Sequence, residues 1–180
     1  LPNAAHQQAS VLASANSSKI NLATRSFLLL LGIAGISCCV AMSMPQVHIV
    51  SYCVGLGYGP AVGVQMLSVM LLGGVVSRIV SGLIADRLGG IKTVLLGASL
   101  QCIALVMYLP FDGMISLYVV SLVFGLSQGG IVPGYAVIVR EYLPPREAGE
   151  QVGFVMMMTI LGMALGGWMS GWIYDLTSSY

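Results

Sequence analysis

Long apolar stretches separated by short polar or glycine-rich segments dominate the chain. Each stretch approaches or exceeds the roughly 20 residues that a helix needs to cross about 30 Å of hydrocarbon. Lipid leaves no water to bond free backbone groups, so these stretches must form helices rather than open sheet. The pattern therefore predicts an all-α fold, a polytopic bundle of five transmembrane helices at residues 26–50, 61–85, 93–109, 114–139 and 152–174.

The composition supports a membrane protein. Hydrophobic residues make up 57% of the 180 positions and charged residues only 7%, against roughly 25% charged residues in soluble domains. Lipid must cover much of such a chain. Residues 1–25 are polar and predict a cytoplasmic linker, and residues 26–180 predict part of a transmembrane domain. The chain starts with Leu1 and shows no cleavable signal pattern, so we expect a fragment of a longer protein.

The basic residues predict the orientation. Six lie outside the spans, all on one side of an alternating topology, whereas the other side carries only Asp112 and Asp175 as charges. The positive-inside rule places the N-terminal segment and the second and fourth loops in the cytoplasm. We expect an integral multi-pass protein of the plasma (cell inner) membrane. The six residues are Lys19, Arg25, Arg87, Lys92, Arg140 and Arg146.

Small residues and prolines recur inside the spans. Glycines at four-residue spacing occupy residues 125–134 and 162–171. They predict close helix contacts, which either hold the helices tightly or let them slide against one another. Pro45 and Pro133 each remove a backbone hydrogen bond and predict bends.

The link between the second and third stretches carries a recognisable pattern. It reads GLIADRLGGIK over residues 82–92. Glycines permit close contact and a tight reversal, and the charges suit the cytoplasmic end of a span. This segment resembles the G-x-x-x-D-R-x-G-x-x-[K/R] signature of the major facilitator superfamily. The resemblance implies a cytoplasmic gate motif made of Gly82, Asp86, Arg87, Gly89 and Lys92. The alternative is a plain topogenic turn.

Further segments resemble one branch of that superfamily. Residues 124–130 and 140–144 look like the tenth helix and following loop of monocarboxylate and oxalate–formate type carriers. Residues 166–176 look like the close of the eleventh helix. The resemblance covers helices seven to eleven, so the N-terminal half of the protein and helix twelve are expected to be missing. It implies a secondary transporter that works by alternating access.

Arg78 is the leading candidate for substrate binding. It is the one basic residue inside a predicted span, about 7 to 8 Å from the middle at the helical rise, and such a charge is costly enough to suggest function. Carriers of the monocarboxylate and oxalate–formate type have an arginine at the corresponding position, implicated in binding a substrate carboxylate. The alternatives are an arginine that reaches the cytoplasmic headgroups or pairs with Asp86.

Other polar residues inside the spans are weaker candidates. Ser121, Gln128 and Tyr135 recur every seven residues and share a face. They could line a path for an anion or make hydrogen bonds between helices. His48 near the outer end of the first span could relay a proton or act as a polar anchor.

Two departures narrow the expected substrate. The fifth span lacks the lysine that oxalate-type carriers use as a second cation, so a dicarboxylate is disfavoured. Gly74 stands where some monocarboxylate carriers place an acidic residue, which puts proton coupling through that position in doubt.

The sequence as a whole predicts a transporter of a small organic anion, such as a monocarboxylate. We expect no enzyme activity, no cofactor, no metal and no nucleic acid partner. The expected partners are the bilayer, the substrate and a coupled proton or counter-anion. The alternatives are a carrier of a non-carboxylate solute or drug, working as a proton antiporter, and a non-transporting receptor or assembly protein.

Overall fold

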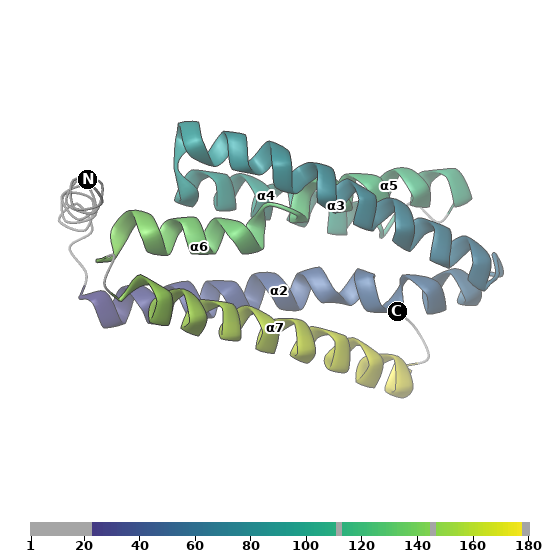
Figure 1. Cartoon of the computed structure of the whole chain (residues 1–180). Helices are drawn as coiled ribbons and strands as arrows, with labels where there is room; N and C mark the ends of the chain where they lie inside the picture. The colour runs from purple at the N-terminus through teal and green to yellow at the C-terminus, as the bar shows by residue number, and fades with distance from the viewer. Residues whose placement is uncertain (1–22, 111–112, 145–146, 178–180) are drawn as a thin grey trace.

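The described part of the chain, residues 23–110, 113–144 and 147–177 of a computed structural model, contains helices and short connections but no strand (Figure 1). Five helical segments are long and apolar enough to cross a membrane, with α5 and α6 together forming the fourth. The prediction of an all-α bundle with five spans is confirmed. The helices are α2 (Thr24–Gly55), α3 (Pro60–Leu88), α4 (Gly90–Met107), α5 (Met114–Gln128), α6 (Ile131–Tyr142) and α7 (Ala148–Thr177).

Some predicted features lie outside the described residues. They include most of the polar linker, from residue 1 to residue 22, and three of the charges used for the orientation. These charges are Lys19, Asp112 and Arg146.

The connection between α3 and α4 is much shorter than the sequence suggested. We expected residues 86–92 to form a loop, but Gly89 alone separates the two helices. Its φ of 85° is readily adopted by glycine, and its carbonyl oxygen accepts hydrogen bonds from the backbone N–H and the hydroxyl of Thr93. One residue therefore reverses the chain.

Two helix pairs dominate the packing, α2 with α7 and α3 with α5. The contact of α2 with α3 lies near the loop that joins them, and the two helices diverge toward their other ends, where α6 lies between them (Figure 1). Glycines allow the close approach. A Cβ on Gly162 of α7 would lie only 2.5 Å from the carbonyl oxygen of Ile36 in α2. The expected close contact through small residues is thus present in the folded bundle.

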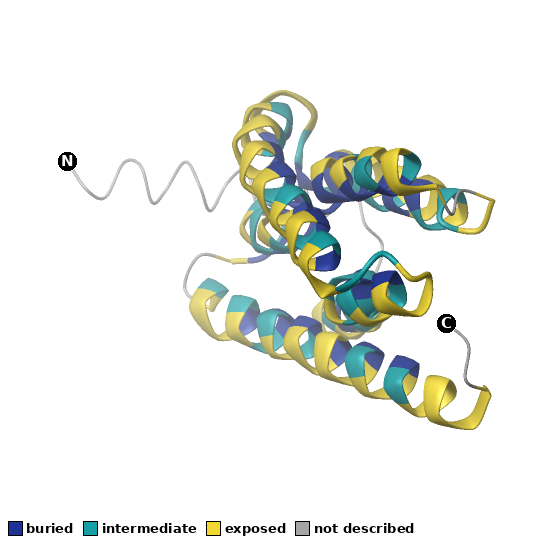
Figure 2. Cartoon of the chain, turned by 90° about the vertical axis from the view of Figure 1, so that its right-hand side faces the viewer, coloured by how far each residue is buried: buried dark blue, intermediate teal, exposed yellow. Residues whose placement is uncertain are grey.

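Apolar side chains cover the outside of the bundle. Buried positions line the inward side of each helix and exposed positions its outward side (Figure 2). Large apolar residues such as Leu72 and Ile79 of α3 are 66% and 67% exposed. In water this surface would drive aggregation, whereas acyl chains solvate it. The exterior is therefore suited to lipid.

The fourth span is broken near its middle. α5 ends at Gln128 and α6 begins at Ile131, with Gly129 and Gly130 between them. Pro133 has no N–H, so the carbonyl of Gly129 lacks its usual helical donor. The predicted bend at Pro133 thus takes the form of an interruption one turn earlier, because glycine adds little resistance to irregular backbone.

Candidate functional site

Arg78 lies deep in the membrane-spanning part of α3. It is four residues past the midpoint of this 29-residue helix, about 6 Å along the axis at 1.5 Å per residue. Its side chain is exposed and makes no hydrogen bond or ion pair with another described residue. The alternative in which Arg78 pairs with Asp86 is therefore not seen in the described residues.

The side chain of Arg78 leaves α3 on the flank that faces away from α4. Gly73 faces α5, because a Cβ on Gly73 would lie 3.1 Å from the carbonyl oxygen of Leu122 in α5. Val80 and Ile84 line a cavity that α4 also lines. Arg78 is five residues from Gly73 and two from Val80, so it lies about 140° and 160° around the helix from them. Arg78 and α4 therefore lie on opposite sides of the α3–α5 contact.

Gln128 ends α5 and reaches across to α2. Its side chain is buried, and its Oε1 accepts a hydrogen bond of 2.9 Å from Nε2 of Gln46. The next residue, Gly129, packs against the backbone of Gly74 and the side chain of Ser77 in α3. The end of α5 thus contacts α2 through a side chain and contacts the turn of α3 that carries Arg78 through its backbone.

Tyr135 lies seven residues after Gln128, in α6. It is 2% exposed and its hydroxyl lies beside the thiol of Cys38 in α2. It helps to line a cavity of about 580 Å³ between α2, α4 and α6, together with Gln101 and Cys102. Gln101 Nε2 donates to the Cys38 carbonyl at 3.1 Å. Gln128 thus makes a hydrogen bond to α2, and Tyr135 lies against the same helix.

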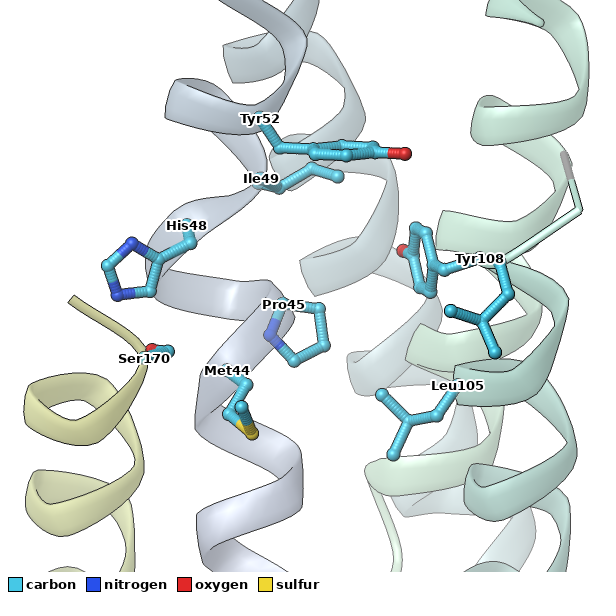
Figure 3. Close-up of a pocket in the computed structure, with 9 residues that line it drawn as sticks. Met44, Pro45, His48, Ile49, Tyr52, Leu105, Tyr108 and Ser170 are labelled. Carbon is cyan, nitrogen blue, oxygen red and sulfur yellow. The ribbon is translucent and has the colours of Figure 1, made fainter. Parts of the chain in front are cut away.

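His48 lies on a different face of α2 from Gln46. The two are separated by two residues, or about 160° around the helix. The Nε2 of His48 is 3.1 Å from the Gly167 carbonyl oxygen of α7. Figure 3 shows His48 turned toward α7, at the edge of a cavity of about 320 Å³ that Tyr52 and Tyr108 also line. The structure therefore brings His48 near neither Gln128 nor the flank of α3 that carries Arg78.

The predicted gate motif surrounds the turn between α3 and α4. Asp86, Arg87 and Lys92 are exposed. Apart from the chain neighbours and the backbone of the same helix, no described atom lies within 4 Å of the position that a Cβ would take on Gly82. The contact that holds this turn comes instead from Glu141 of α6, whose two carboxylate oxygens accept hydrogen bonds of 3.1 and 2.9 Å from the Gly90 N–H. A carboxylate at a helix N-terminus satisfies a free donor and interacts favourably with the helix dipole.

Comparison with known proteins identifies the family. The family model described as Major Facilitator Superfamily matches residues 61–179. The chain belongs to this superfamily.

Individual transport proteins also match parts of the chain. Monocarboxylate transporter 13 of Rattus norvegicus is 26% identical over 139 residues, which cover 76% of this chain and 32% of the relative. Probable anion transporter 5 of Arabidopsis thaliana is 31% identical over 106 residues, 58% of this chain and 24% of the relative. The gallate transporter of Pseudomonas putida is 29% identical over 112 residues, 60% and 24% respectively. The chain therefore spans a third or less of the length of these relatives.

Two residues of this superfamily member were missed by sequence reasoning. Gln46 is a polar side chain within a long apolar run, directly after Pro45, and this position alone could have marked it. Glu141 gave no such signal, because a charged residue at the end of a span is ordinary. Only the packing of α6 against α4 shows its role.

Replacing Glu141 with glutamine is expected to lower the free energy of unfolding by about 1 kcal/mol, because glutamine loses the charge and one of the two acceptor oxygens at the α4 N-terminus. The thermal unfolding midpoint of the complete protein in detergent would show the change. Glu150→Gln, at an exposed position in the first turn of α7, is the control for charge. An unchanged midpoint for Glu141→Gln would show that the cap adds no stability.

Proposed function

We propose that this chain is part of a secondary transporter that carries a small organic anion, such as a monocarboxylate, across the plasma (cell inner) membrane by alternating access. Membership of the superfamily supports transport rather than catalysis. The names of the relatives, a monocarboxylate transporter, an anion transporter and a gallate transporter, support an anionic substrate. In this class of carrier two repeats rock around a central site.

The proposal of an anionic substrate rests on the exposed guanidinium of Arg78, which is unpaired among the described residues. A guanidinium inside an apolar helix is costly unless it faces a partner or a wet cleft. Here it is exposed and has no partner among the described residues. Its planar donors match both oxygens of a carboxylate, which makes a bidentate pair with a substrate the chemistry best suited to it.

The remaining predicted residues have proposed roles around this site. Gln128 lies next to the α3 turn that carries Arg78, and we assign it to the substrate path. Tyr135 and His48 remain predicted contacts, each beside a cavity away from that turn. Residues 82–92 form the proposed cytoplasmic gate, and the Glu141 carboxylate that bonds the Gly90 N–H would tie this gate to the broken fourth span.

Cysteine labelling tests whether the Arg78 flank faces water. Leu71 and Val76 of α3 are both 52% exposed. Leu71 lies about 20° around the helix from Arg78, whereas Val76 lies about 160° away. In the complete protein, with the natural cysteines replaced, we expect a membrane-impermeant, water-soluble thiol reagent to label Leu71→Cys at least ten times faster than Val76→Cys, because only the first would line the cleft.

The same experiment separates a carrier from a receptor or assembly protein. A carrier should also show slower labelling of Leu71→Cys when an anionic substrate is added, since the substrate occupies the cleft. Equal labelling at the two positions, or none at Leu71→Cys, would mean that no aqueous cleft borders Arg78 and would remove the basis of the proposal.

A further inference from the structure

The glutamine pair Gln46–Gln128 joins the proline-containing turn of α2 to the interruption between α5 and α6. Gln46 directly follows Pro45, whose missing N–H leaves a carbonyl of α2 without its helical donor. Gln128 directly precedes the interruption at Gly129 and Gly130. The hydrogen bond of 2.9 Å between them is a contact between side chains 82 positions apart in the sequence. Irregular backbone at membrane depth is tolerated where it is buried in protein or lines a cavity.

One hydrogen bond leaves much of the pair unused. Each carboxamide carries two N–H donors and one acceptor oxygen. With Nε2 of Gln46 bonded to Oε1 of Gln128, the amide nitrogen of Gln128 and the amide oxygen of Gln46 have no hydrogen-bond partner among the described residues. If both amide groups were rotated by 180°, the Gln46 nitrogen and the Gln128 oxygen would be the unused groups instead.

These unused groups are not completely sealed in the core. Within the described chain, the buried side-chain nitrogen and oxygen atoms that lack a partner comprise Oε1 of Gln151 alone. The free nitrogen and oxygen of the glutamine pair are not among these sealed atoms, although Gln128 as a whole is only 4% exposed. The hydrogen bond between the two glutamines joins α2 to the end of α5, and the next residue, Gly129, packs against the Gly74–Ser77 turn of α3. Arg78 leaves that same turn on the flank away from α4.

We propose that Gln46 is a specificity-determining residue, which acts with Gln128 to bind an uncharged polar group of the substrate while Arg78 holds its carboxylate. This inference rests on the function proposed above. The pair offers a donor and an acceptor side by side, and a hydroxyl group needs both. α7 carries no lysine or arginine that could bind a second carboxylate. The site thus favours a monocarboxylate that also carries a hydroxyl over the same acid without it.

The test compares transport of matched acids by the complete protein in proteoliposomes. Two pairs of probes differ by one hydroxyl each, 2-hydroxypropanoate with propanoate and 4-hydroxybenzoate with benzoate. Gln46→Met keeps the length of the side chain and removes its hydrogen bonds. We expect it to lower kcat/KM for the hydroxy acid of a transported pair about three- to tenfold, the effect of one hydrogen bond, and to change the value for the acid without hydroxyl less than twofold.

A matched control separates recognition from helix packing. Gln65 of α3 also makes a hydrogen bond between helices, in which its Oε1 accepts from the Tyr118 hydroxyl at 2.6 Å. It lies 13 residues from Arg78, about 20 Å along the helix. Gln65→Met should leave the ratio of kcat/KM for the two acids unchanged. If Gln46→Met does not fold, Gln46→Asn retains a carboxamide that is one methylene short and should still shift the ratio.

The outcomes distinguish the inference from the function beneath it. An equal loss for both acids of a transported pair would make Gln46 structural and overturn the inference, while anion transport would stand. An unchanged ratio in folded Gln46 variants would do the same. If the unmodified protein transports none of the four acids, the proposed function fails and the role of Gln46 fails with it.

Discussion

Uptake of an anionic substrate by the complete protein is expected to fall about 100-fold or more when Arg78 is replaced with alanine. Such a loss corresponds to about 2.7 kcal/mol in kcat/KM, within the 2–5 kcal/mol typical of removing one partner of a desolvated, hydrogen-bonded charge pair. Alanine would leave the substrate carboxylate desolvated with no cation to compensate it. Initial rates of uptake into proteoliposomes, normalised to the amount of reconstituted protein, would measure the change.

Two further variants make this result specific to the site. Arg78→Lys keeps the charge but loses the planar fork, so we expect it to retain part of the activity with a raised KM. Arg25→Ala removes an exposed cation from the first turn of α2 and should leave uptake within twofold. Full activity of folded Arg78→Ala toward an anion would remove Arg78 from the substrate site, and an equal loss in Arg25→Ala would point to a general effect of charge.

The spans could be predicted because their physics is local. Several stretches of about 20 predominantly apolar residues exceed what a soluble domain of this length would hold, and every backbone group in lipid must be bonded within the chain. The exact ends were less predictable. α2 continues to Gly55 and α4 already begins at Gly90. A helix can extend past the hydrocarbon, because polar residues are no longer costly there, and so the apolar run does not mark its ends.

The candidate site was only partly predictable, because its composition depends on contacts between helices. Arg78 could be identified alone, as a charge in an apolar span. Ser121, Gln128 and Tyr135 were placed on one face by their seven-residue spacing, but spacing does not give partners. In the structure Ser121 contacts Tyr108, and Gln128 contacts Gln46. No local pattern relates residues 82 positions apart.

The contact between α3 and α5 sets the relative position of Arg78 and Gln128, and Gly125 is one of the glycines that let these helices come close. A Cβ on Gly125 would collide with the carbonyl oxygen of Met70 and lie 2.9 Å from its carbonyl carbon. These are backbone atoms, which cannot rotate away, so α3 and α5 would have to separate. The polar groups at the end of α5 would then move away from the turn of α3 that carries Arg78.

Gly125→Val is accordingly expected to destabilise the complete protein by about 3 kcal/mol, at the upper end of the usual cost of overpacking. The thermal unfolding midpoint and the fraction of monodisperse protein in detergent should both fall. Any protein that still folds should transport poorly. The control is Gly153→Val in α7, where the added Cβ would meet no described side chain or neighbouring helix within 4 Å beyond its chain neighbours. Its unfolding midpoint should remain close to that of the parent. A Gly125→Val protein as stable as its control would mean that α3 and α5 are not held together through this contact, and that the proposed proximity of Arg78 to Gln128 has no packing to support it.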